Sequence, residues 1–274
     1  MSERSERIIG AAGFGYALAD SWTIARRTLT HWRMQPGIVV FTWFFPVLML
    51  LMFGALLGGA MESPEGSSYY ELLVPGIFAL AMLFGLEGTM TAVTTDVSKG
   101  VTDRFRSLPM SSAAVVMGRC IADMLDSVVT LVVLVGTGLA LGWRWHEGLL
   151  SALAAFGLLL LLRFALLWVG IFIGLTVKNA QSVTMVQVVV WPIGFLSSAF
   201  VATSTMPAWL GTIAQWNPLS ATATAARTLF GNPDPSATAT WIGTHAEVAA
   251  IIGPLLLTAV FLPLSAHRFR TLSR

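Results

Sequence analysis

The sequence predicts an all-α membrane protein with six transmembrane helices. Of its 274 residues, 55% are hydrophobic and only 11% are charged, whereas ordinary soluble domains carry about 25% charged residues. The mean hydropathy is +0.75, and the apolar residues form six runs of about the length that crosses a bilayer. These observations exclude a typical water-soluble enzyme, because one globular core cannot bury so much apolar surface.

The six apolar runs define the predicted spans. The first and fifth runs contain no charged residue, the second contains only Glu87, and the fourth contains only Arg163. The third run carries Asp123 and Asp126 near its start, and the sixth is the shortest at 17 residues. The predicted transmembrane domain covers residues 37–264, with spans at residues 37–57, 72–95, 121–141, 149–177, 183–202 and 248–264.

Positive charges predict the orientation of these spans, because cytoplasmic loops are enriched in Lys and Arg. With both termini cytoplasmic, 13 of the 16 Lys and Arg residues lie inside, Arg144 and Arg227 lie outside, and Arg163 lies within the membrane. The opposite orientation would place those 13 outside. We therefore expect residues 1–36 and 265–274 to be cytoplasmic. The first of these segments has apolar residues at helical spacing, which predicts a helix lying in the inner interface.

The inner connection between the second and third spans predicts a short amphipathic helix. Val101, Phe105 and Leu108 fall on one helical face, and Asp103 faces elsewhere. Pro109 ends this helix, because proline cannot continue the backbone hydrogen-bond pattern. The apolar face is suited to docking into a groove of a partner protein. The alternative is a loop that rests on the inner lipid headgroups.

The outer connection before the last span, residues 204–247, is longer than a simple turn requires. It contains Asn217 followed by Pro218, a good N-cap and a good first helical residue, and Gly231 supplies a C-terminal stop. We therefore expect two short helices that form a partly embedded lid. A purely structural cover is the alternative.

Motifs for chemistry are absent from the sequence. Neither Lys99 nor Lys178 follows a glycine, so the Gly-Lys-Ser/Thr sequence that binds nucleotide phosphates does not occur. The four histidines are scattered over different loops, and Cys120 is the single cysteine, which argues against a metal site. The net charge of +2 is too small for a nucleic-acid-binding face. We expect no cofactor in this chain and no enzymatic activity of its own.

The order of these parts resembles the membrane subunit of ABC type-2 exporters, and most closely the daunorubicin-resistance permease group. The likeness covers nearly the whole chain, and its most specific pieces are Arg106-Ser107-Leu108-Pro109, Gly118-Arg119, and Asn217-Pro218-Leu219 with Arg227.

The resemblance implies a six-span half-transporter in a bacterial plasma membrane. It would pair with a second permease subunit, identical or homologous, and with two cytoplasmic ATPase subunits that hold ATP and Mg. Residues 22–33 would form the connecting helix, residues 207–230 the outer re-entrant helices, and residues 101–109 the coupling helix. The residues expected to contact the ATPase are Val101, Thr102, Arg104, Phe105, Arg106, Leu108 and Pro109.

The cargo implied by the likeness is an amphipathic drug or a lipid-like molecule. Aromatic rings hold such molecules without demanding one shape. We therefore expect rings from the first, second and fifth spans to line the cargo path, namely Phe41, Phe45, Phe78, Trp191 and Phe195.

Charged residues within the predicted spans need partners, because an unpaired charge near the centre of a membrane helix is costly. Glu87 and Arg163 lie at similar predicted depths, so we expect them to pair, with Asp126 as the competing partner of Arg163. An alternative function is an ion-coupled secondary transporter that uses Glu87 and Asp126 as ion sites, although no internal repeat supports it. A membrane-embedded enzyme would need clustered catalytic side chains, which the sequence does not offer.

Overall fold

The computed structural model describes most of the chain, and every regular element in the described part is a helix. The connecting helix expected within residues 1–36 and the coupling helix expected at residues 101–109 lie outside the described residues, apart from Pro36. The described ranges are 36–58, 68–100, 112–177, 179–201, 203, 206–232 and 241–271.

Five of the described helices are long and apolar enough to cross a membrane. They are α2 (Pro36–Leu57), α3 (Tyr69–Ser98), α5 (Ser112–Ala140), α6 (Gly148–Thr176) and α11 (Ala246–Thr271). The shorter helices are α7 (Ala180–Phe195), α8 (Ala208–Trp216), α9 (Pro218–Phe230) and α10 (Trp241–Thr244).

The third, fifth and sixth predicted spans differ most from the helices observed. The third was expected at residues 121–141, but α5 begins at Ser112, nine residues earlier. The fifth was expected at residues 183–202, but α7 ends at Phe195, seven residues earlier. The side-chain amide of Asn217 donates to the carbonyl oxygens of Ile193 (2.8 Å) and Leu196 (2.9 Å), so it satisfies acceptors left free at the end of α7. The sixth, expected at residues 248–264, extends as α11 through residue 271.

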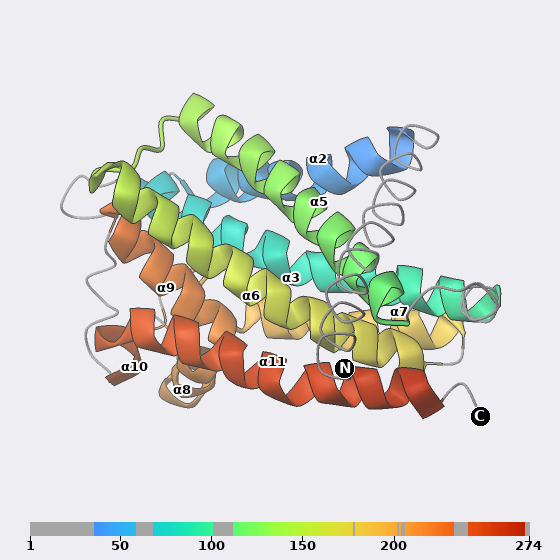
Figure 1. Ribbon diagram of the computed structural model, residues 1–274. Helices are drawn as coiled ribbons and strands as arrows, with labels where there is room; N and C mark the ends of the chain where they lie inside the picture. The colour runs from blue at the N-terminus through green and yellow to red at the C-terminus, as the bar shows by residue number, and fades with distance from the viewer. Residues whose placement is uncertain are drawn as a thin grey trace, which may run out of the picture.

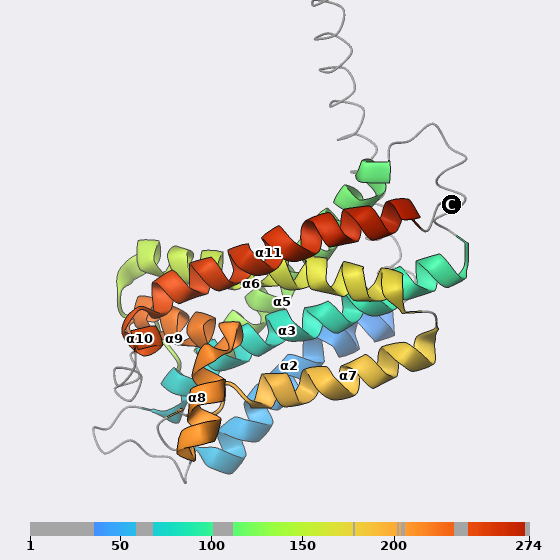
Figure 2. The same ribbon diagram turned by 90° about the horizontal axis from the view of Figure 1, so that it is seen from below.

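Helix α3 lies at the centre of the bundle. Figure 2 shows α6 and α11 on one side of α3, with α2 and α7 on the other. Helices α2, α5, α6, α7 and α9 all pack against α3, and its middle, from Leu73 to Leu83, is buried. Because α3 is surrounded by protein, its apolar side chains form a core rather than a lipid-facing surface.

Helices α3 and α6 approach closely because α6 has glycines on the contact face. A Cβ added at Gly170 would lie 3.0 Å from the Leu86 carbonyl oxygen, and one at Gly174 would lie 2.9 Å from the Met90 carbonyl oxygen. The hydroxyl of Thr94 donates to the Gly174 carbonyl oxygen at 3.2 Å. Small residues spaced in this way allow membrane helices to pack backbone against backbone.

Helices α8 and α9 form the outer segment predicted from the sequence. Asn217 caps α9 by accepting from the Leu219 N–H, Pro218 is the first helical residue, and Gly231 ends the helix with φ of 76°. All three local signals are therefore confirmed. Helix α9 packs among α3, α6 and α11 (Figure 1), whereas α8 runs across the direction of α3 and α7 (Figure 2).

The helix directions place both ends of the described chain together. In Figure 1, α2 begins and α11 ends at the same end of the bundle. We call this the inner end, and the opposite end, where α5 meets α6, the outer end. Helix α3 ends and helix α5 begins at the inner end as well.

Candidate functional site

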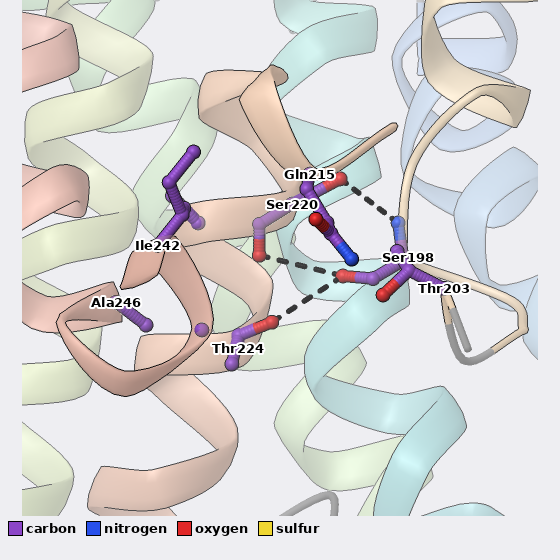
Figure 3. A pocket seen from close by; sticks show the side chains of 9 residues that line it. Ser198, Thr203, Gln215, Ser220, Thr224, Ile242 and Ala246 are labelled. Atoms are coloured by element: carbon purple, nitrogen blue, oxygen red, sulfur yellow. Dashed lines mark hydrogen bonds between the residues drawn. The ribbon is translucent and has the colours of Figure 1, made fainter. Parts of the chain in front are cut away.

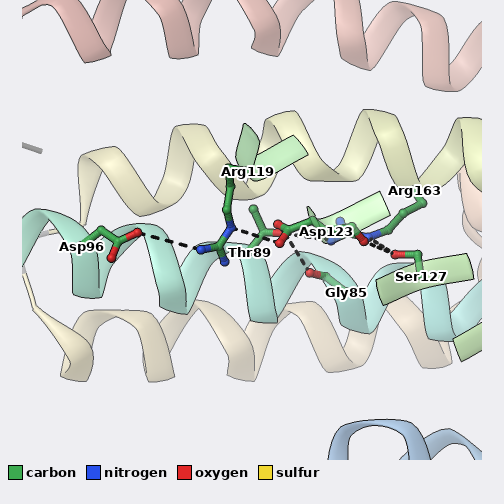
Figure 4. Close-up of polar contacts among 7 residues, drawn as sticks. All are labelled: Gly85, Thr89, Asp96, Arg119, Asp123, Ser127 and Arg163. Carbon is green, nitrogen blue, oxygen red and sulfur yellow. Dashed lines mark hydrogen bonds and ion pairs between the residues drawn. The ribbon is translucent and has the colours of Figure 1, made fainter. Parts of the chain in front are cut away.

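A charged cluster links three helices toward the inner end (Figure 4). The Nη2 atom of Arg163 on α6 lies 3.8 Å from Oδ2 of Asp123 on α5. Arg119, one turn before Asp123, places its Nε atom 3.0 Å from Oδ1 of the same carboxylate, and its Nη1 atom 3.9 Å from Asp96 on α3. The Arg119 Nε contact is an ion pair without hydrogen-bond alignment. The Asp123 carboxylate therefore forms ion pairs with two guanidinium groups.

Two hydroxyl groups accept hydrogen bonds from Arg163. Its Nε donates to Ser127 Oγ at 2.9 Å, and its Nη2 donates to Thr89 Oγ1 at 2.8 Å. Thr89 in turn donates to Asp123 Oδ2 at 2.6 Å. Arg163 is only 2% exposed, and a charge so deeply buried is tolerated only when it is paired and hydrogen-bonded. We call Arg119, Asp123, Arg163, Thr89 and Ser127 the inner polar cluster.

The expected pair between Glu87 and Arg163 is wrong. Glu87 instead faces α7, where Gln187 Nε2 lies 3.5 Å from its Oε2 atom. Side chains at similar depth can face different directions around the α3 axis, because consecutive residues of a helix are about 100° apart. Thr89 faces Arg163, so Glu87, two residues earlier, lies on nearly the opposite side of α3. Similar depth in the membrane was therefore not sufficient for contact.

Asp126 has its own partner on α2. Its Oδ1 atom accepts from the indole Nε1 of Trp43 at 3.0 Å. A neutral donor thus holds this carboxylate, while Asp123, one turn earlier on α5, is the acid paired with Arg163. Asp123 was not predicted from the sequence to be the partner of Arg163. The spacing of Arg119, Asp123 and Ser127 at i, i+4 and i+8 was the available signal, because it places a polar stripe on one face of α5.

Three of the five nominated rings come together between α2 and α7. The ring centroids of Phe45 and Trp191 are 5.8 Å apart, and those of Trp191 and Phe195 are 6.1 Å apart. Phe84 on α3 joins them at 5.5 Å from Phe45 and 5.1 Å from Trp191. Phe195 also stacks on Phe200 at 5.3 Å. We call Phe45, Phe84, Trp191, Phe195 and Phe200 the aromatic surface.

The other two nominated rings lie elsewhere. Phe78 is completely buried and packs on Trp143 and Phe230, with centroid distances of 5.5 and 6.2 Å. It therefore belongs to the outer part of the protein core. Phe41 is 67% exposed on α2, and no ring contact joins it to the aromatic surface in the described part of the chain.

At the outer end, Arg227 of α9 fixes the segment that follows α7. Its Nε donates to the Leu72 carbonyl oxygen at 2.9 Å, and its Nη2 donates to the carbonyl oxygens of Ser198 (2.6 Å) and Ala199 (3.2 Å). Although it was assigned to an outer loop, Arg227 has no exposed surface. Two of its acceptors, the carbonyl oxygens of Ser198 and Ala199, lie outside any regular helix. Hydrogen bonds to these backbone groups explain why a charge is buried here.

A small cavity lies beside this anchor, and hydroxyl-bearing residues are among those that line it (Figure 3). Ser198 connects its walls, because its N–H donates to Ser220 Oγ at 3.0 Å and its hydroxyl lies 3.5 Å from Thr224 Oγ1. The cavity volume is about 20 Å³, which suits about one water molecule rather than a drug-sized ligand. Its lining residues are Ser198, Thr203, Gln215, Ser220, Ala221, Thr224, Ile242, Gly243 and Ala246.

The described residues offer no metal centre, since no three His, Cys, Asp or Glu side chains among them gather closely enough. Five long apolar helices and paired charges within the bundle define a polytopic membrane protein. The chain belongs to the ABC-2 type transporter family, whose model matches residues 20–230.

Two kinds of relatives carry drug-resistance names. The chain is 34% identical over 257 residues to the daunorubicin resistance ABC transporter permease protein DrrB1 of Streptomyces coeruleorubidus, covering 90% of this chain and 87% of that protein. It is also 25% identical over 203 residues to the probable doxorubicin resistance ABC transporter permease protein DrrC of Mycobacterium tuberculosis, covering 74% of each chain.

Proposed function

We propose that this protein is the permease subunit of an ATP-driven exporter that moves an amphipathic drug or lipid-like cargo out of the cytoplasm or the inner leaflet. The observation that carries the proposal is the 34% identity to a daunorubicin resistance permease across 90% of the chain. By the same likeness, the protein resides in a bacterial plasma membrane.

We further propose six crossings with both termini cytoplasmic. Helix α7 has only 16 residues, but it connects the inner end of α6 to the outer segment that contains α8 and α9. With α7 counted, the crossings are even in number, in agreement with the shared end of α2 and α11. The excess of Lys and Arg on that side supports its assignment as cytoplasmic.

The proposed partners are two cytoplasmic ATPase subunits, which hold ATP and Mg, and a second permease subunit. Residues 101–109 are proposed to dock into the ATPase. An ion pair supports a mechanical role for residues 101–109. Asp96 precedes this segment, Arg119 follows it, and their side chains lie 3.9 Å apart. Asp123 extends the connection to Arg163 on α6. Movement of the docked segment would therefore be transmitted to the centre of the bundle.

The cargo is proposed to pass along the aromatic surface. Four of its rings are at least partly exposed, with Phe195 46% exposed, whereas Phe200 is buried. The rings are contributed by α2, α3, α7 and the segment after α7. Flat ring faces bind varied apolar molecules, which suits an exporter of amphipathic compounds.

Reconstitution tests this function directly. The permease is co-expressed with its ATPase, and ATP-dependent uptake of daunorubicin into inside-out vesicles is followed by its fluorescence. We expect uptake that requires ATP hydrolysis and persists when an ionophore collapses the ion gradients. An ATPase variant without its phosphate-binding lysine is the control. Uptake that survives in this control but stops with the ionophore would instead indicate an ion-coupled secondary transporter using Glu87 or Asp126.

A further inference from the structure

Glu87 differs from Asp123 and Asp126 of α5, because among the described residues it has no charged partner and no short hydrogen bond. Asp123 contacts two arginines, and Asp126 accepts from Trp43. Glu87 has one long contact of 3.5 Å to the uncharged amide of Gln187. Its second oxygen, Oε1, is buried without a hydrogen-bond partner. A carboxylate oxygen without a donor is costly in this environment, so a role in binding a positively charged group would explain it.

The surroundings of Glu87 match an aromatic cation. Phe84 lies one helical turn before it on α3, and Trp191 lies one turn beyond its neighbour Gln187 on α7. Phe45 from α2 completes a triangle of rings with these two, with centroid separations of 5.1 to 5.8 Å. The carboxylate therefore lies at the inner edge of three aromatic rings. Ring faces attract both planar apolar groups and cations, and a carboxylate adds a charge-assisted hydrogen bond to an amine.

The edges of this site reach the surface of the bundle. Helices α2 and α7 both pack on α3 but have no extensive contact with each other, and Glu87, Phe45, Phe84 and Trp191 are all only partly buried. Phe195 and Phe200 continue the row of rings from Trp191 toward the outer end. The ring centroids of Phe53 on α2 and Phe200 are 4.2 Å apart. A charged group held at Glu87 would thus lie at the inner start of a continuous aromatic path.

We propose that Glu87 is the cargo-selecting residue of this permease, binding the ammonium group of an aromatic amphiphile whose rings lie against Phe45, Phe84 and Trp191. The proposal rests on the proposed export function and adds to it a preference for singly charged aromatic amines over neutral analogues. Gln187 positions this carboxylate by donating from its Nε2 atom to Oε2 of Glu87.

The test compares two cargoes that differ in one charge. Daunorubicin carries a primary amine, and in N-acetyl-daunorubicin that amine is an uncharged amide. Binding to the purified permease is measured by fluorescence anisotropy, and ATP-dependent uptake is measured in vesicles. We expect Glu87→Gln to weaken binding and uptake of daunorubicin about tenfold, because a charge-assisted contact is lost. The N-acetyl compound should change less than twofold, and Glu87→Asp should retain the preference for the amine.

Glu71→Gln is the matched control, because it removes a carboxylate from the outer end of the same helix, where Glu71 faces His146 at 3.6 Å. It should leave both cargoes unaffected. An equal loss of binding and uptake for the two compounds in Glu87→Gln would show a structural role and overturn the proposal. Wild-type binding and uptake of both compounds in this variant would overturn it as well. Without ATP-driven uptake of either compound by the wild type, the export function fails. The binding measurement still tests the role of Glu87 in that case. Equal affinities for both compounds, in the wild type and in Glu87→Gln, would overturn that role.

Discussion

Arg163 of α6 and Asp123 of α5 face each other inside the bundle, with Arg163 Nη2 3.8 Å from Asp123 Oδ2. The two sides of this pair are not equivalent. Asp123 also has Arg119, 3.0 Å away, whereas Arg163 has no second carboxylate at ion-pair distance among the described residues. Loss of the acid therefore isolates a buried cation, but loss of Arg163 leaves the acid paired.

This asymmetry predicts that Asp123→Asn destabilises the protein more than Arg163→Met. Removing one partner of a buried ion pair costs about 3 to 5 kcal/mol when the other is left uncompensated. Thermal unfolding of the purified permease in one detergent measures both variants. The double variant Asp123→Asn/Arg163→Met should recover part of the loss. A larger decrease for Arg163→Met than for Asp123→Asn would contradict the proposed sharing of Asp123.

Arg227 is predicted to be irreplaceable by lysine. Its guanidinium donates from two nitrogens to carbonyl oxygens of Leu72, Ser198 and Ala199, and one ammonium group cannot reproduce that fork. Each hydrogen bond to a charged group contributes about 1.5 to 3 kcal/mol. Both Arg227→Lys and Arg227→Ala should therefore lower the midpoint of thermal unfolding, with lysine restoring only a minor part.

The control for this prediction is Thr228→Ala, because Thr228 is exposed and its hydroxyl donates to the Thr224 carbonyl oxygen of its own helix. It should unfold near the wild-type midpoint. Full stability of Arg227→Lys would mean that charge alone, rather than the guanidinium geometry, holds the segment after α7.

A single methyl group at residue 76 should separate α3 from the segment after α7. A Cβ there would collide with the Ala199 backbone, including its carbonyl oxygen, and backbone cannot yield as a flexible side chain does. We expect Gly76→Ala to destabilise the protein by about 1 to 3 kcal/mol, the usual cost of overpacking. Gly157→Ala on α6 is the comparison, since a Cβ there meets nothing within 4 Å. Equal unfolding midpoints of the two variants would refute the close approach.

The proposed docking helix gives a functional prediction. Phe105→Asp would place a charge on the apolar face of residues 101–109, where an unpaired buried charge costs several kcal/mol. Stimulation of the ATPase by the permease should fall strongly, while membrane insertion and the unfolding midpoint of the permease persist. Asp103→Asn, on the other face of the predicted helix, should couple normally. If Phe105→Asp couples as well as wild type, the docking face is misassigned.

Local signals in the sequence predicted the outer helices well. Asn217, Pro218 and Gly231 set the ends of α9 as expected, because capping depends on residues within one turn of the helix end. The C-terminus of α7 could not be predicted in this way. Its terminal carbonyl groups are satisfied by Asn217, more than twenty residues later in the chain, so its end depends on a tertiary contact.

The sequence by itself determined that the chain is helical and membrane-embedded, because apolar runs of bilayer length require internally hydrogen-bonded segments. It also indicated which charges must find partners. Only the tertiary structure decided which partners these are: Asp123 rather than Glu87 for Arg163, and backbone carbonyl groups for Arg227. Depth along a helix can be counted from the sequence. The direction in which a side chain points depends on how each helix is rotated against its neighbours, which packing alone sets.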